Sequence, residues 1–194
     1  SRVQAGGEMD EIIREISADT CAVFEAERLT IYLVNEDRTL IVSKIKTGLD
    51  SYDDLKLPIS AEYSIAGYVA LNMRPVNIAD AYDTAELNAY DPPVYFLRDV
   101  DRSTGYRTRQ VLAAPIFDAA DPKVVLGVVQ LINTLSGKPF PRGAEERIVE
   151  LCRALVAALM QPKKAKPLGT RTKYDHLVID GVITEAELEL ATRL

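Results

Sequence analysis

The chain has 194 residues, of which 47% are hydrophobic and 27% are charged, so it can bury a sizeable core and its composition excludes wholesale disorder. Its formal net charge of −6 argues against non-specific nucleic-acid binding, because that mode needs Lys and Arg side chains to neutralise phosphates. No stretch has the pattern of a signal peptide, and no apolar run reaches the ~18 residues of a membrane span.

The cysteines and the two ends of the sequence also carry information. Cys21 and Cys152 lie far apart without metal-ligand spacing, which fits a reducing cytoplasm better than a disulfide framework. We therefore expect a cytoplasmic domain without membrane insertion. The sequence starts without Met and stops inside a charged helical pattern, so we expect a fragment of a longer protein. Residues 1–7 are expected to be a disordered or artificial start.

The first half of the chain alternates helix and strand patterns. Apolar residues at helical spacing predict an amphipathic helix, and two apolar runs joined by a polar turn predict a hairpin. Pro58 indicates that its strand lies at a sheet edge, and Ser64 is suited to cap the following helix. The expected elements are a helix over 8–26, strands over 29–34, 40–45 and 55–59, a helix over 65–72 and a strand over 76–78.

The second half begins with a long irregular segment. Residues 79–100 contain two consecutive prolines and predict a loop that can act as a lid. A polar loop over 99–110 is expected to lead into a hairpin with strands over 111–117 and 124–132. Because these runs are nearly continuous rather than alternating, the hairpin is expected to be central and covered on both faces. Residues 144–160 predict another amphipathic helix.

The end of the chain changes character. Residues 161–173 hold two Pro, one Gly and five Lys or Arg, which predicts a linker. Residues 174–194 predict a short helix stopped by Gly181 and a second helix opened by a capping box of Thr184 and Glu187. Their Leu-Val-x-x-Gly-x-Ile-Thr-x-x-x-Leu pattern resembles the opening helix pair of the N-terminal domain of type II secretion and type IV pilus assembly ATPases. The resemblance implies the start of a second helical module.

The usual motifs of catalytic and metal sites are missing from the sequence. It has no Gly-x-x-x-x-Gly-Lys-Ser/Thr, no Gly-x-Gly-x-x-Gly, no His-Glu-x-x-His and no Cys-x-x-Cys. The single histidine, His176, lies beyond the expected linker, which excludes a Ser-His or Cys-His couple within residues 8–160. We therefore expect no catalytic residues, no metal site and no cofactor.

Four motifs carry a longer resemblance. They are Ser64-Ile65-Ala66-Gly67-Tyr68-Val69-Ala70, Pro75-Val76-Asn77-Ile78-x-Asp80-Ala81-Tyr82, Asp101-x-x-Thr104-Gly105-Tyr106-x-Thr108 and Gly127-Val128-x-Gln130-Leu131-x-Asn133. Through them, residues 8–160 resemble a GAF domain, a small-molecule-sensing module of bacterial signalling proteins and cyclic-nucleotide phosphodiesterases. The resemblance implies an α+β fold, with a central antiparallel sheet flanked by helices on both faces and amphipathic helices at both ends.

The resemblance also implies a small-molecule pocket between the sheet and the elements that cover one face. It assigns six residues to this pocket: Ile65, Ala66, Asp101, Thr104, Thr108 and Gln130. The first two would offer backbone N–H groups at a helix start, where an anion such as a cyclic phosphate is favoured. The next three would hydrogen-bond a ribose or base, and the glutamine would reach in from the last strand. The alternative is structural: these side chains cap a turn and satisfy strand edges.

Two positions depart from the pattern of cyclic-nucleotide-binding GAF domains. Those domains carry a Lys and an Asp that pair near the pocket, and this sequence has Thr134 and Ala144 at the matching positions. Both halves of the ion pair are missing together, so no orphan charge is left and the fold should tolerate the change. The departure counts against cyclic-nucleotide binding. Bilin attachment lacks a suitably placed cysteine, since Cys21 and Cys152 both lie on expected helix stripes.

The leading expectation is a non-catalytic regulatory module that binds a small ligand, with nucleotides as one class. It would relay a conformational or dimer signal to a downstream domain of a secretion or pilus ATPase, through a homodimer of the terminal helices. The alternative is a ligand-free dimerisation or interaction scaffold whose pocket is filled by Tyr82, Tyr95 or Phe96. Methionine-sulfoxide-reductase activity would need a reactive cysteine trio, which the two cysteines do not supply.

Overall fold

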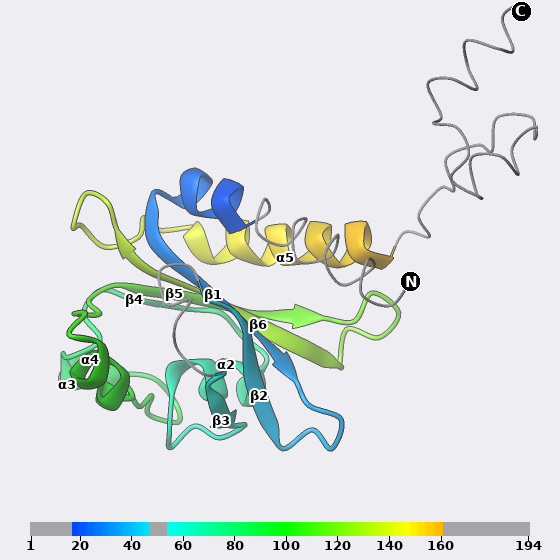
Figure 1. Ribbon diagram of the computed structural model, residues 1–194, viewed down its shortest axis with the longest axis horizontal. Helices are drawn as coiled ribbons and strands as arrows, with labels where there is room; N and C mark the ends of the chain where they lie inside the picture. Colours follow the sequence, from blue (N-terminus) through cyan, green and yellow to red (C-terminus); the bar gives the residue numbers. More distant parts are fainter. Residues whose placement is uncertain (1–16, 47–53, 161–194) are drawn as a thin grey trace, which may run out of the picture. The chain divides into compact units, whose positions relative to one another are not determined.

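Six strands form one antiparallel sheet in the part of the chain that the structure, a computed structural model, describes: residues 17–46 and 54–160. The strands are β1 (Ala26–Val34), β2 (Leu40–Lys46), β3 (Lys56–Pro58), β4 (Val76–Ile78), β5 (Val111–Phe117) and β6 (Val125–Thr134). Their order across the sheet is β3-β2-β1-β6-β5-β4. The order places β1 and β6 at the centre and the short strands β3 and β4 at the two edges (Figure 1).

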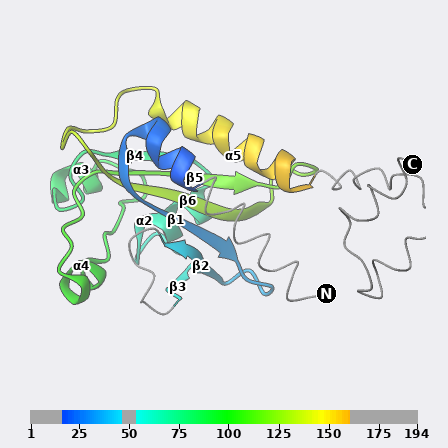
Figure 2. The ribbon, with the colours of Figure 1, turned by 45° about the horizontal axis from the view of Figure 1, so that its top comes forward.

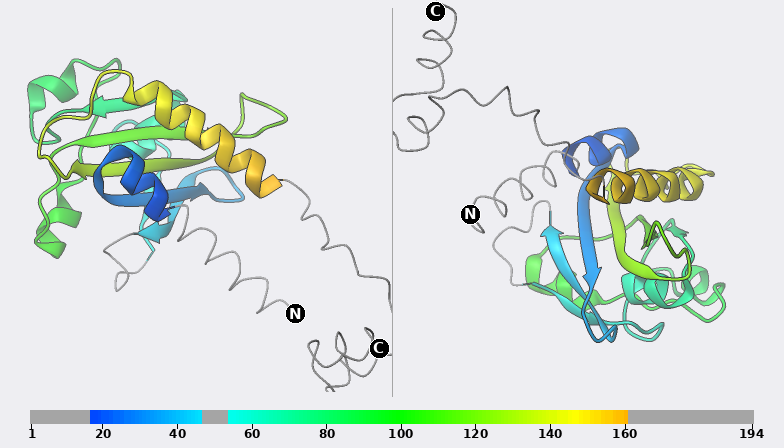
Figure 3. Two further views of the ribbon diagram at one scale, coloured as in Figure 1. Left: turned by 90° about the horizontal axis from the view of Figure 1, so that it is seen from above. Right: turned by 90° about the vertical axis from the view of Figure 1, so that its right-hand side faces the viewer.

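Helices cover both faces of this sheet (Figures 1 and 2). Residues 17–24 are helical, and the further helices are α2 (Ile65–Asn72), α3 (Thr84–Asn88), α4 (Arg98–Thr104) and α5 (Ala144–Met160). One face packs against α5 and residues 17–24, and α5 runs beside those residues in both views of Figure 3. The other face packs against α2, with α3 and α4 on the same side. The predicted α+β class, with helices on both faces of an antiparallel sheet, is confirmed.

The alternation of side chains along each strand produces two separate cores. Leu29 and Ile31 of β1 lie with Ile148 of α5 in one core, on the face that α5 covers. Tyr32 of β1 and Val128 of β6 lie with α2 in the other core. All of β5 except Phe117 is buried, as expected for a strand covered on both faces. The prediction of a central hairpin over β5 and β6 is therefore confirmed.

Local signals fix the position of α2. The Ser64 hydroxyl accepts a hydrogen bond from the Gly67 N–H at 3.0 Å, which caps the first turn. The backbone of α2 then passes close to the end of β3, because a Cβ at Gly67 would lie 2.5 Å from the Pro58 oxygen. Pro58 ends the edge strand β3, as its lack of an N–H donor predicts. The predicted cap, helix and edge strand are all confirmed.

Three sequence-based predictions differ from the structure in the described residues. The long loop over 79–100 contains α3, whose first turn is capped by the Asp83 carboxylate. The polar loop over 99–110 begins with α4, which ends at Gly105 in the left-handed conformation (φ 70°). The first helix ends at residue 24 rather than 26, because Glu25 has φ 50° and β1 starts at Ala26. The predictions for residues 1–7, 161–173 and 174–194 lie outside the described residues.

Candidate ligand pocket

A cavity of about 60 Å³ lies between the sheet and the helices that cover its α2 face. Strands β1 and β6 form one wall, the start of α2 forms a second, and α4 with the residues before it forms a third. The lining residues are Thr30, Tyr32, Leu55, Leu57, Ser64, Ile65, Ala66, Phe96, Leu97, Val100, Asp101, Thr108, Gln130 and Ile132. Since drug-sized ligands occupy pockets of roughly 300–1,000 Å³, a larger ligand would have to displace part of this wall.

The strand wall carries three polar side chains. Thr30 of β1 lies directly opposite Gln130 of β6, so both side chains point into the same face of the sheet. Tyr32 is two residues further along β1 and therefore shares that face. Within residues 17–46 and 54–160, none of these three side chains makes a hydrogen bond, although Thr30 and Tyr32 are each only 4% exposed. Desolvation by burial raises the pKa of the Tyr32 phenol.

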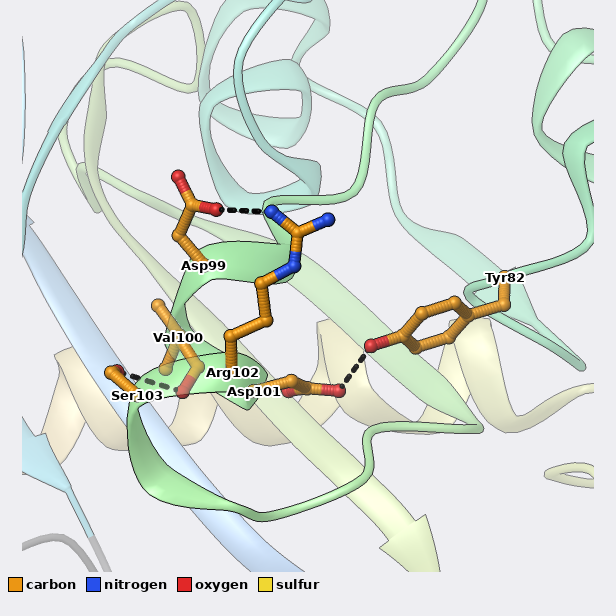
Figure 4. A network of polar contacts seen from close by, with 6 residues as sticks. All are labelled: Tyr82, Asp99, Val100, Asp101, Arg102 and Ser103. Carbon is orange, nitrogen blue, oxygen red and sulfur yellow. Dashed lines mark hydrogen bonds and ion pairs between the residues drawn. The ribbon is translucent and has the colours of Figure 1, made fainter.

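Asp101 of α4 forms the polar part of the opposite wall. Its carboxylate accepts hydrogen bonds from the Thr108 N–H and hydroxyl, both at 2.7 Å, and from the Tyr82 hydroxyl at 3.0 Å. Figure 4 shows Tyr82 reaching this carboxylate, while Asp99 pairs with Arg102 elsewhere on α4. Partial burial and the bond to Asp101 both raise the pKa of the Tyr82 phenol. Asp101 thus ties α4 to the segment that leads into β5.

Aromatic residues support this wall from outside. The Tyr82 ring packs edge-to-face on Phe96 at 5.2 Å between centroids, and Phe96 lines the cavity. The guanidinium carbons of Arg107 and Arg98 lie 3.3 and 4.8 Å from the centre of the Tyr82 ring. Of the three aromatic residues that the scaffold alternative would place in the pocket, only Phe96 lines it, whereas Tyr95 is exposed.

Five of the six pocket residues predicted from the sequence line the cavity: Ile65, Ala66, Asp101, Thr108 and Gln130. Thr104 does not, because its hydroxyl donates to the Val100 oxygen at 2.8 Å and accepts from the Tyr106 N–H at 3.2 Å. Ile65 and Ala66 are the first residues of α2, where backbone N–H groups have no partner within the helix. Binding by these residues stays a prediction.

Thr30 and Tyr32 are lining residues that sequence reasoning missed. They occur in a mostly apolar strand segment, Leu29 to Val34, whose side chains are most simply interpreted as core residues. The available signal was their spacing of two, which puts them on one face of the strand. Only the pairing of β1 with β6 shows that this face meets Gln130 and the cavity.

A second polar cluster joins the pocket wall to the start of β1. The Tyr106 hydroxyl donates to Glu27 at 2.5 Å, and the Asn133 amide donates to the Tyr106 oxygen at 2.9 Å. The side-chain oxygen of Asn133 accepts a hydrogen bond from the Arg109 backbone N–H at 2.7 Å. Burial and the bond to Glu27 raise the pKa of the Tyr106 phenol. The segment after α4 is therefore fastened to β1 three residues beyond the end of the N-terminal helix at residue 24.

The positions that replace the Lys and Asp of cyclic-nucleotide-binding GAF domains have local roles. The Thr134 hydroxyl donates to the Lys138 oxygen at 2.5 Å, and Ala144 is buried at the start of α5. Among the described residues that line the cavity, Asp101 is the only one with a formal charge.

The cysteine pKa values and the placement of metal-ligating side chains bear on redox and metal chemistry in the described residues. Burial raises the pKa of the Cys152 thiol to about 12 and also raises the pKa of Cys21, so neither is an activated thiolate. Over residues 17–46 and 54–160, no group of three or more His, Cys, Asp or Glu side chains is arranged to hold a metal ion. No helix in the same ranges is long and apolar enough to cross a membrane.

Comparison with known families agrees with this architecture. A sequence profile of the GAF domain matches residues 8–159. The chain belongs to the GAF domain family. GAF domains are small-molecule sensory and regulatory modules and are generally not catalytic.

Two proteins of similar sequence are phosphodiesterases that are much longer than this chain. The chain is 30% identical over 138 residues to the "Probable 3′,5′-cyclic phosphodiesterase pde-5" of Caenorhabditis elegans, covering 66% of this chain and 17% of that protein. It is 41% identical over 76 residues to the dual 3′,5′-cyclic-AMP and -GMP phosphodiesterase 11 of Drosophila melanogaster, covering 39% of this chain and 4% of that protein. The chain thus spans less than a fifth of either relative.

Among solved structures, the GAF domain of a phosphoenolpyruvate-protein phosphotransferase from Coxiella burnetii is similar in fold. It has a TM-score of 0.55 and 19% sequence identity, with coverage of 87% of this chain and 83% of that one. At this identity the likeness concerns the fold alone. These comparisons establish the family and the fold but do not identify a ligand.

Proposed function

We propose that this GAF domain binds a small molecule in the cavity between β1, β6, α2 and α4, and passes the resulting change to the rest of its protein. The observation that carries the proposal is the pair of walls around the cavity. One wall presents polar side chains that have no partner among the described residues, and the other is a short helix held by few groups. This arrangement supports ligand recognition on a rigid sheet beneath a wall that can shift.

The movable part of the proposed site is α4 with the residues before it. Phe96, Leu97 and Val100 occupy the space that a ligand larger than about 60 Å³ would need. A ligand that prefers a displaced α4 would shift the population toward that arrangement. The hydrogen bonds of Asp101 with Thr108, and of Tyr106 with Glu27, would carry the displacement to β1 and its preceding helix.

The wider role is also a proposal. A homodimer through the terminal helices would let a change at β1 alter the relation between two subunits. The resemblance of residues 174–194 to the start of an ATPase domain suggests a type II secretion or type IV pilus ATPase as the recipient of the signal. The phosphodiesterase relatives suggest nucleotides as one ligand class, although none of the described lining residues is a cation that could pair with the phosphate.

A ligand-free scaffold is the second candidate, and one observation favours it. Both Asp101 oxygens already accept hydrogen bonds from within the domain, and Phe96 fills part of the cavity. A wall closed in this way needs no ligand to complete its packing and hydrogen bonds. In that case the domain would serve dimerisation or protein interaction without a small molecule.

A thermal-shift titration against nucleotides, cyclic nucleotides and common metabolites separates the two candidates. A ligand that binds only the folded state raises stability by about 2.7 kcal/mol at a hundredfold excess over its Kd. We expect at least one saturable rise in Tm, and we expect Gln130→Leu to abolish it. Gln130 is preferred to Thr108 as the test position, because Thr108→Ala also removes a bond to Asp101. A flat response across the panel would favour the scaffold.

A further inference from the structure

Three polar groups on the strand wall have no hydrogen-bond partner among residues 17–46 and 54–160. They are the Thr30 and Tyr32 hydroxyls and the Gln130 amide, which make no hydrogen bond to any part of the described chain. Thr30 and Tyr32 are nine-tenths buried or more, and both line the cavity. An unpaired polar group in a buried residue costs free energy unless water or a ligand meets it, so the hydroxyls of these two residues, together with the half-buried Gln130 amide, indicate a polar ligand in the cavity.

The geometry of the two strands brings these groups together. Thr30 and Gln130 are opposed residues of an antiparallel pair, whose Cβ atoms lie about 4.5–5.5 Å apart on one face. Tyr32 shares that face at the next position along β1. A hydroxyl can donate and accept, and a carboxamide carries one acceptor and two donors. The wall is therefore complementary to a ligand edge that presents a donor beside an acceptor.

The charges around the cavity select among ligands with such an edge. Asp101 lies on the opposite wall, and no Lys, Arg or His is among the lining residues. An anionic ligand would enter a partly desolvated site that holds a like charge and no countercharge, which disfavours it. The rest of the lining is mostly apolar, including Leu57, Leu97 and Val100. These features fit an uncharged molecule with an apolar body.

We propose that the pocket recognises an uncharged ligand through an amide or amide-like ring edge, and that Thr30, Tyr32 and Gln130 bind this edge. The inference rests on the proposed function, in which this cavity is the ligand site. It adds the chemical class of the ligand and assigns two binding residues, Thr30 and Tyr32. The N-terminus of α2 is not required to hold a phosphate in this arrangement.

Benzamide and benzoate test the class directly, because they share a shape and differ in charge. Each is titrated into the 194-residue chain while backbone amide signals are followed by NMR. We expect benzamide to shift the signals of residues 28–32 and 128–132 saturably, with a Kd at least fivefold lower than that of benzoate. Tyr32→Phe and Thr30→Val each remove one hydroxyl at nearly constant shape, and we expect each to raise the benzamide Kd several-fold.

Tyr63→Phe is the matched control, because Tyr63 is exposed and does not line the cavity. It should leave the benzamide Kd unchanged. Benzoate binding as tightly as benzamide would overturn the ligand class but keep the cavity as a ligand site. Benzamide binding that Thr30→Val and Tyr32→Phe leave unaltered would overturn the assignment of these residues. Absence of any shift with both compounds would overturn the inference, and the metabolite panel would then decide separately whether the proposed function also fails.

Discussion

At the scale of single residues, the pocket contains two kinds of polar group. Asp101 and Thr108 satisfy each other within the fold, and their bonds hold α4 against the sheet. Thr30 and Tyr32 are equally buried but have no partner in the described chain. The first kind contributes to stability, whereas the second lines the cavity, where a bound ligand would supply the missing partners. Replacing one threonine of each kind by valine distinguishes the two kinds.

Thr30→Val and Thr108→Val form a matched pair for this distinction. The first removes a hydroxyl without a partner, so we expect the free energy of unfolding to stay constant or to rise by about 0.5–1 kcal/mol. The second leaves Asp101 short of one hydrogen bond in a buried position, and we expect a loss of about 1–3 kcal/mol. Urea denaturation of both variants measures the difference. Equal losses would mean that Thr30 has a structural partner after all.

At the scale of elements, α2 is placed by a close approach of its backbone. A Cβ at Gly67 would lie 2.5 Å from the Pro58 oxygen and 2.8 Å from the Ser60 oxygen, so the side chain of any other residue would push α2 away from its neighbours. At Gly105 the requirement for glycine is conformational rather than steric. This residue ends α4 at φ 70°, and a Cβ there would meet no atom within 4 Å.

These reasons predict losses of stability of different size on substitution. Gly67→Ala should cost about 1–3 kcal/mol through overpacking, and a larger residue should cost more. Gly105→Asn should cost under about 1 kcal/mol, because Asn tolerates the left-handed conformation and meets no atom within 4 Å there. Thermal unfolding of the two variants gives the comparison. A Gly67→Ala variant as stable as the wild type would contradict the packing of α2 described above.

The elements also show how far the sequence could predict this fold. The cap at Ser64, the hairpin over β5 and β6 and the edge strand at Pro58 are local signals, and each was confirmed. Helix α4 was missed because its seven residues, Arg98–Thr104, are mostly polar and it has no side-chain N-cap. Its position depends on the distant partners of Asp101. Thr30 and Tyr32 were missed because the register of β1 against β6 is a long-range property of the sheet.

At the scale of the whole molecule, the α5 face of the sheet is the proposed dimer face. Val23, on the helix over residues 17–24, is 56% exposed although it is a large apolar residue. A second subunit packed on this face would cover it. The signal transfer proposed above depends on this contact between subunits. The bond between Tyr106 and Glu27 fastens the pocket wall to β1, and β1 follows the helix that would form the contact.

Val23→Glu tests the dimer at one position. We expect the variant to weaken self-association by tenfold or more, measured by sedimentation or light scattering over a range of concentrations, because a charge would be buried in the contact. Leu71→Glu serves as the control, since Leu71 is exposed on α2, on the other face of the sheet, and should not affect association. If the wild-type chain is monomeric at high concentration, the dimer relay is wrong.

Hydrogen–deuterium exchange with a ligand from the thermal-shift panel tests the central claim most directly. The claim is that a small molecule binds between the sheet and α4 and alters the wall around it. The account predicts changed exchange in residues 65–72 and 98–110 and in the central strands β1 and β6, and predicts that Gln130→Leu removes these changes. A ligand whose exchange changes are confined to other residues, or a panel without any ligand, would contradict it.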